Sequence, residues 1–328
     1  MSKVNTYTPF LMVLLVLGCG AAAAPFSSAQ HYAKLVEEGK QEATHAYHQE
    51  AEELWRSVSA RIPSLDTTER AQWYLARADY LQFGHQFAEA LDTLKRVEAT
   101  GTLMSSALLM RARILLTLGE VERAAIACKQ LRGLAPVDVW GTCELEVKGR
   151  AGELKLAYEG LNRLADQDKT RTSAIVLWRR QILAEQAHLL GNYEAALNWL
   201  QSDNYAAQPV VVQKQIIDVW LLQNRPQQVL SQTSECPAND SLLPDSLIVR
   251  FARAELEAES ALTCWRQLAA ERIYIRELRH DELHTADLAY YHAYISKDAD
   301  AALYWARLTV SVSREPFDLV LLDAAKEL

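Results

Sequence analysis

A short pattern that marks the break between two helices recurs along the chain at nearly constant spacing. Its clearest copy is Gly191-Asn192-Tyr193-Glu194-Ala195-Ala196-Leu197, which places a helix breaker, then an apolar residue two positions later, then a small residue three further on. Counted on the middle residue, the copies lie at Phe87, Val121, Leu154, Tyr193, Pro226, Glu259 (a degraded copy) and Ala299. Most steps are 33 or 34 residues, a period that indicates stacked helical hairpins.

Composition agrees with a chain made of helices. Half of the 328 residues are hydrophobic, and there are only 12 Gly and 9 Pro, which favours an all-α fold. We therefore predict an all-α helical-hairpin solenoid of about seven repeats over residues 63–328. The net charge of −8 argues against nucleic acid as a partner and against broad attraction to anionic lipid, because binding to either requires positive charge.

The first 24 residues have the layout of a secretory signal peptide. Lys3 precedes an apolar run from Phe10 to Leu17, and small residues follow up to Ala24. The run is too short to span a membrane as a helix. Two processing routes remain open: Val16-Leu17-Gly18-Cys19 resembles a lipobox that would lipidate Cys19, whereas the alanines before Pro25 suit ordinary signal peptidase. We expect an exported protein that is either periplasmic or anchored to a membrane only through lipid on Cys19.

Residues 25–62 are predicted to form one long amphipathic helix ahead of the repeats. Apolar residues recur at helical spacing from about Ser28 to Arg61, within a stretch rich in Glu and Gln. His45 and His48 lie one turn apart in this stretch, but two histidines without a convergent third ligand do not make a zinc site. We interpret them as part of a solvated face.

The remaining cysteines form an even set suited to an oxidising compartment: Cys128, Cys143, Cys236 and Cys264. Cys128 and Cys143 lie on either side of the predicted turn at Gly133–Pro136, nearly equidistant from it. Side chains placed in this way come together in an antiparallel hairpin, so we predict a disulfide between them. Two buried free thiols are the alternative. Cys236 and Cys264 are candidates for a second disulfide.

The repeat period and the string Gly191–Leu197 resemble the tetratricopeptide repeat, a helix-turn-helix unit of 34 residues. The resemblance extends from about Thr67 to Leu328. It implies a right-handed superhelix whose concave groove binds a peptide or a protein. The C-terminal stretch, with Arg314-Glu315-Pro316-Phe317-Asp318, also resembles the closing repeat of exported bacterial proteins of this kind. We therefore expect a protein-protein interaction scaffold or adaptor of the cell envelope, with a protein or peptide partner.

Enzymatic chemistry has little support in the sequence. The best candidate is His280-Asp281-Glu282-Leu283-His284, two histidines four positions apart, but the zinc-protease motif requires Glu directly after the first His. The chain has no glycine-rich phosphate loop and no nucleophile elbow. We expect no enzyme activity, no metal and no cofactor. The alternative hypothesis is a metal-dependent envelope enzyme that uses the region around His280 and His284.

Overall fold

The computed structural model describes residues 29–42, 45–167, 174–233, 236, 243–280 and 284–328, and the fold is all-α, as predicted. The elements in chain order are α1 (Ala29–Glu42), α2 (His45–Val58), the 3₁₀ turn η1 (Ile62–Ser64), α3 (Thr67–Phe83), α4 (Phe87–Glu98), α5 (Met104–Thr117), α6 (Val121–Gln130), α7 (Val137–Arg150), α8 (Leu154–Ala165), α9 (Ala174–Leu189), α10 (Tyr193–Leu200), the 3₁₀ turn η2 (Ser202–Ala207), α11 (Val210–Leu222), α12 (Pro226–Leu230), α13 (Asp245–Glu257), α14 (Cys264–Leu278), α15 (Thr285–Tyr291), the π-helical turn η3 (His292–Ser296), α16 (Ala299–Val312) and α17 (Pro316–Lys326). None of these helices is long and apolar enough to cross a membrane.

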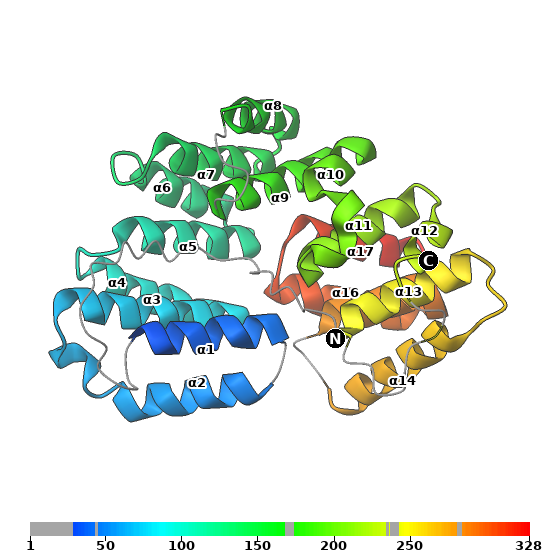
Figure 1. Ribbon diagram of the computed structural model, residues 1–328, viewed down its shortest axis with the longest axis horizontal. Helices are drawn as coiled ribbons and strands as arrows, with labels where there is room; N and C mark the ends of the chain where they lie inside the picture. The colour runs from blue at the N-terminus through cyan, green and yellow to red at the C-terminus, as the bar shows by residue number, and fades with distance from the viewer. Residues whose placement is uncertain (1–28, 43–44, 168–173, 234–235, 237–242, 281–283) are drawn as a thin grey trace, which may run out of the picture.

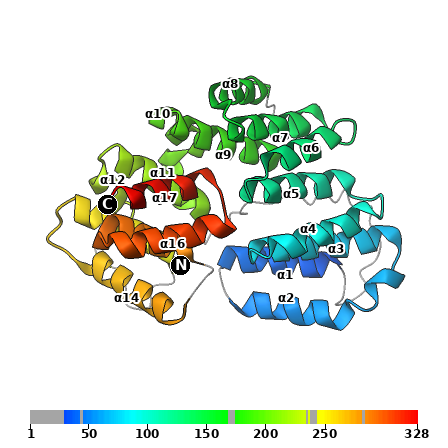
Figure 2. The same cartoon turned by 180° about the vertical axis from the view of Figure 1, so that it is seen from behind.

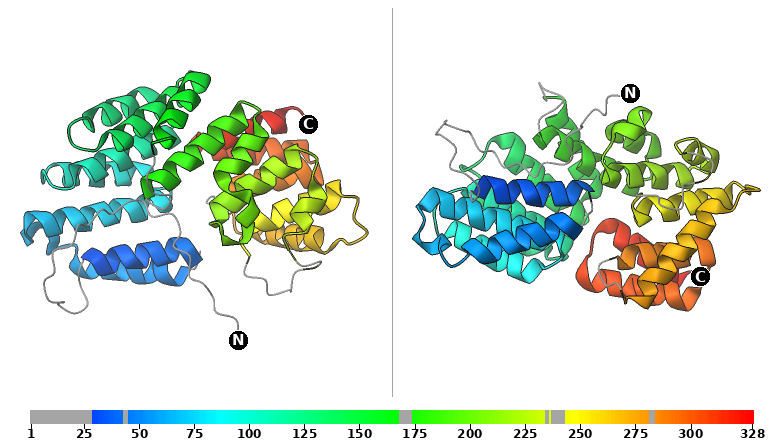
Figure 3. Two further views of the ribbon diagram at one scale, coloured as in Figure 1. Left: turned by 45° about the horizontal axis from the view of Figure 1, so that its top comes forward. Right: turned by 60° about the horizontal axis from the view of Figure 1, so that its bottom comes forward.

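Successive helices pack as hairpins, and the hairpins stack side by side in a tetratricopeptide-like array. In Figure 1 the array rises from α1 and α2 to α8 and then descends to α14, so the chain forms an arch. Its two arms, α1–α8 and α11–α17, are joined through α9 and α10 (Figure 3). The first helix of each hairpin, such as α5, α7 and α9, contacts the first helix of a neighbouring hairpin.

The sequence pattern gives the start of six second helices correctly. These helices begin at the marker residues themselves: Phe87, Val121, Leu154, Tyr193, Pro226 and Ala299. The residue two positions earlier has a positive φ in every case. Three of these residues are glycines, such as Gly191 with φ of 74°, and three are not: His85, Asn224 and Lys297 adopt φ of 57°, 56° and 58°. A left-handed residue ends one helix and turns the chain into the next.

The copy at Glu259 does not mark a helix start, which corrects the prediction. The positive φ falls on Glu259 itself, and α14 begins only at Cys264. The start of α14 is set instead by a side chain from the preceding helix. The buried carboxylate of Glu255 on α13 accepts hydrogen bonds from the backbone amides of Trp265 (3.2 Å) and Arg266 (3.0 Å). It thereby satisfies first-turn amides that have no partner within α14.

The single long N-terminal helix is also wrong, because α1 and α2 form a further hairpin that stacks on α3 (Figures 1 and 2). The ring of Tyr32 on α1 lies 5.9 Å from that of Trp55 on α2 and 5.4 Å from that of Trp73 on α3. One straight helix over this stretch would be about 50 Å long at 1.5 Å per residue, roughly twice the length of α3. Folding back lets both halves of the apolar stripe be buried against the array.

The apolar core consists of three clusters that follow one another along the chain. One spans α1 to α5, the second α5 to α9, and the third runs from the end of α9 to α17. Within the described residues, the cluster that contains side chains of α16 and α17 contains none from α5 or α7. Where the end of the array approaches its middle, the contact is therefore made by other groups.

Two disulfides tie neighbouring elements together. Cys128 on α6 is joined to Cys143 on α7, with their Cα atoms 5.5 Å apart and both side chains buried. Cys236 is joined to Cys264, the first residue of α14, also with a Cα separation of 5.5 Å. The Cys128–Cys143 pairing is the one predicted from their positions in the hairpin, and Cys236 and Cys264 were the candidates for a second bridge.

Candidate functional site

The inner helices of one arm hold a short segment from the other arm. The link between α16 and α17 is extended at Ser313 and Glu315 and reaches the end of α5 (Figures 1 and 2). There the backbone amide of Arg314 donates a hydrogen bond of 2.6 Å to the carbonyl oxygen of Thr117. We call residues Ser313–Phe317 the closing segment, and the surface of α5, α7 and α9 that it contacts the inner face.

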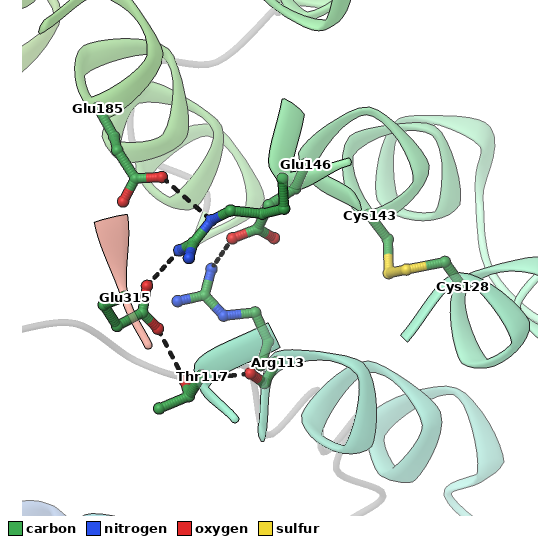
Figure 4. Close-up of polar contacts among 8 residues, drawn as sticks. Arg113, Thr117, Cys128, Cys143, Glu146, Glu185 and Glu315 are labelled. Carbon is green, nitrogen blue, oxygen red and sulfur yellow. Dashed lines mark hydrogen bonds and ion pairs between the residues drawn. A yellow bond between two sulfur atoms is a disulfide. The ribbon is translucent and has the colours of Figure 1, made fainter. Parts of the chain in front are cut away.

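A glutamate of the closing segment enters a cluster of arginines and carboxylates on the inner face (Figure 4). Glu315 accepts a hydrogen bond from Arg150 Nη2 on α7 and another, of 2.7 Å, from Thr117 Oγ1 on α5. Arg150 Nε lies 3.5 Å from Glu185 Oε1 on α9. Beside them, Arg113 on α5 donates a 2.6 Å hydrogen bond to the buried Glu146 on α7.

The cluster contains three carboxylates and two guanidinium groups, and burial gives the carboxylates different pKa values. Burial raises the pKa of Glu185 to about 7, because it outweighs the attraction of Arg150. Burial likewise raises the pKa of Glu146 above its usual value. Burial acts in the same direction on Glu315, but the charges of Arg150 and Arg113, together with the hydrogen bonds from Arg150 and Thr117, hold its pKa below the usual value. Near neutral pH Glu315 is therefore a charged carboxylate, whereas Glu185 gains or loses its proton in this pH range.

Two further features belong to the contact between the closing segment and the inner face, which we call the closing contact: an aromatic pair, and the close approach of the Arg314 side chain to Gly119. The ring of Phe317 lies 4.8 Å from that of His188 on α9, and burial lowers the pKa of His188. At Gly119, just after α5, a Cβ would lie 2.8 Å from Cδ and 3.3 Å from Cβ of Arg314. The absent side chain at Gly119 therefore leaves room for the closing segment.

A second polar cluster lines the first helices of the other arm. Arg250 on α13 donates two hydrogen bonds, of 2.9 and 2.8 Å, to the carboxylate of Asp218 on α11, which also accepts one of 3.1 Å from the Tyr290 hydroxyl. Burial lowers the pKa of Lys214 on α11. Burial raises the pKa of Asp318, in the first turn of α17, to about 6. The start of α17 thus lies among charged groups of both arms.

The histidine pair considered for metal binding does not share a helix face. His280 follows the end of α14 with φ of 49°, and His284 precedes α15, while residues 281–283 lie outside the described residues. The spacing of four positions therefore does not place the two histidines on one face of a helix. In the described part of the chain, no group of three His, Cys, Asp or Glu side chains is arranged to hold a metal ion. The side chains of His45 and His48, and residue Cys19, lie outside what the structure describes.

The closing contact was not predicted from the sequence. Its members come from three first helices and from the start of α17, and the contact between Arg150 and Glu315 joins residues 165 positions apart. One local signal was present: Glu185 interrupts the apolar stretch Ile182-Leu183-Ala184 of α9. A carboxylate on the packed face of a first helix needs a partner, because an isolated buried charge is costly.

Comparisons with known proteins find similarity among solved structures alone. No family model matches the chain, and no curated protein matches it. Among solved structures, a Rap protein complexed with competence and sporulation factor is 11% identical, with 91% of this chain and 77% of that chain covered and a TM-score of 0.50. A tetratricopeptide repeat protein from Parabacteroides merdae is 12% identical (90% and 99% covered, TM-score 0.43), and the anaphase-promoting complex hetero-tetramer Cut9–Hcn1 is 15% identical (90% and 62% covered, TM-score 0.35). At this identity, the likeness to the Rap protein shows a similar fold.

Proposed function

We propose that this protein is an exported scaffold of the cell envelope that binds a segment of another protein on the inner face of its hairpin array. One observation carries the proposal: the inner face already holds an extended segment, through a backbone hydrogen bond from Arg314 and a carboxylate contact to Glu315. A surface that binds a segment of its own chain in this way has the groups needed to bind another. The similar Rap protein was likewise solved in complex with competence and sporulation factor.

The envelope location is supported by the N-terminal leader and by the disulfides. The leader predicts export, and Cys128–Cys143 and Cys236–Cys264 suit an oxidising compartment. We propose that the mature protein is periplasmic or attached to a membrane through lipid on Cys19. Both forms keep the array in the same compartment as an envelope partner.

Site-specific photo-crosslinking in intact cells tests the binding surface. Leu177 is exposed and lies on the stripe of α9 that leads, at intervals of three or four residues, to Glu185 and His188 of the inner face. Ile126 is 60% exposed on α6, whose neighbours Ala124, Ala127 and Cys128 are buried, so it faces away from the array. A photo-activatable residue at position 177 should form protein adducts that are missing from position 126. No adduct at position 177, or equal adducts at both, would contradict the proposal.

A further inference from the structure

We propose that the inner face recognises a segment that is extended up to a carboxylate and then enters a helical turn with an aromatic residue two positions after the carboxylate, and that the closing segment is a built-in occupant that a partner displaces. The inference rests on the proposed function and names the chemistry of the partner. The partner is a protein segment rather than a small molecule, because part of the recognition is through backbone.

Three features of the inner face each hold a different part of the closing segment. The Thr117 carbonyl oxygen accepts from the Arg314 amide at 2.6 Å, and Arg314 lies between the extended residues Ser313 and Glu315. Arg150 and the Thr117 hydroxyl donate to the two carboxylate oxygens of Glu315. The His188 ring packs against Phe317. Together they specify the backbone, a carboxylate and an aromatic ring in fixed order.

The closing contact is mostly polar, as expected of an interface that can open and close. Helix packing elsewhere in the array is apolar, but in the described residues the apolar clusters do not extend from α5 or α7 to α17. Opening this contact therefore exposes little apolar surface on α5 and α7, and there the hydrophobic effect opposes it weakly. On α9 the closing segment contributes the ring of Phe317 against His188. The α17 helix would keep its packing against α15 and α16 when the closing segment leaves the inner face.

Arg150 would be left ready to bind a second carboxylate. Its remaining partner, Glu185, lies 3.5 Å from Nε, and that nitrogen makes no hydrogen bond within the described residues. The Nη2 atom that binds Glu315 would have lost its acceptor. A buried guanidinium favours a new acceptor strongly, because hydrogen bonds to charged groups contribute about 1.5–3 kcal/mol each.

A partner must compete with an occupant that is covalently attached. The apparent affinity of the inner face for a free segment is reduced by the fraction of molecules in which the closing segment has left. Weakening the built-in contact should therefore increase the affinity for a segment added in trans. This behaviour separates a displaceable occupant from a contact that is only part of the fold.

The test uses a fluorescent peptide with the sequence of residues 311–320, Ser-Val-Ser-Arg-Glu-Pro-Phe-Asp-Leu-Val. Its binding to the full chain is compared for the natural protein, Glu315→Ala and the double variant Glu315→Ala/Arg150→Ala. The peptide should bind Glu315→Ala at least about tenfold more tightly than the natural protein, and the double variant should lose that gain. A peptide carrying Glu315→Gln should bind Glu315→Ala about tenfold more weakly than the natural peptide.

Folding of each variant is checked by circular dichroism and thermal unfolding. Should Glu315→Ala not fold, Glu315→Gln keeps the side-chain shape and removes the charge, and a several-fold gain in peptide binding is expected. Equal binding by the natural protein and the folded variant, binding that ignores Arg150, or no binding to the folded variant would each overturn the inference. Crosslinks from position 177 together with any of these results would leave the proposed function standing and reject the inference alone.

Discussion

Arg150 on α7 and Glu315 at the start of α17 form an ion pair that joins the middle of the array to its end. The side chain of Arg150 is only 12% exposed, and that of Glu315 is 32% exposed. The pair lies between two arms whose apolar cores do not meet there within the described residues. The closed form of the arch therefore depends on a small number of polar contacts.

The close approach at Gly119 predicts a difference between two glycine substitutions. Gly119 and Gly191 both have φ of +74°, so alanine at either position should cost about 1–2 kcal/mol in backbone strain. Only at Gly119 does the added methyl meet a neighbour, Arg314. Gly119→Ala should therefore lower the free energy of unfolding by about 1 kcal/mol more than Gly191→Ala in urea titrations. The excess should shrink when Arg314→Ala is also present, because the 2.8 Å contact with Cδ is then gone and only the 3.3 Å contact with Cβ remains; equal costs for the two glycine substitutions would show that the closing segment does not lie there.

The raised pKa of Glu185 predicts how stability changes with pH. Because its pKa in the folded protein is about 7, against a usual 4.5, the folded chain holds a proton that the unfolded chain has released between these values. Stability from this group is fully present below about pH 4.5 and is lost as pH rises through 7. Glu185→Gln should flatten the decline between pH 5 and 8 by on the order of 1–2 kcal/mol. Asp318, with its pKa near 6, contributes equally to both proteins and cancels. Parallel pH curves for the two proteins would contradict the assignment.

The disulfide between Cys128 and Cys143 predicts a loss of stability on reduction. It closes a loop with a sequence separation of 15, and such a bridge contributes about 3 kcal/mol, chiefly by restricting the unfolded chain. The variant Cys128→Ala/Cys143→Ala should unfold at a correspondingly lower urea concentration than the natural protein. Peptide mapping without reductant should find the bridge in protein isolated from its native cells; free thiols at both positions in that material would refute it.

Export predicts that the mature chain lacks the leader. Intact-mass measurement of protein isolated from its native cells should show a terminus at Cys19 carrying a diacylglyceryl group, or an unmodified terminus after Ala23 or Ala29. The first result supports a lipid anchor and the second a free periplasmic protein. A mature protein that still begins with residues 1–18 would exclude both.

The sequence predicted local features well and distant contacts poorly. The helix starts at Val121 and Tyr193 were predictable because a left-handed residue and a small packed residue mark each turn within a few positions. The start of α14 was not, because Glu255 on another helix determines it. The hairpin of α1 and α2 was missed because the amphipathic pattern runs through both helices. No periodicity reveals the approach of Glu315 to Arg150, since it depends on the curvature of the whole array.

A double-mutant cycle on Arg150 and Glu315 tests the central claim most directly. Urea unfolding is measured for the natural protein, Arg150→Met, Glu315→Gln and the double variant, with the exposed pair Arg123 and Glu120 on one arm as a control cycle. A coupling free energy of about 2 kcal/mol is predicted for Arg150 and Glu315, as for charge-assisted contacts with little exposure, against about 0.5 kcal/mol or less for the control. A coupling between Arg150 and Glu315 no larger than that of the control would contradict the closure of the array on its inner face.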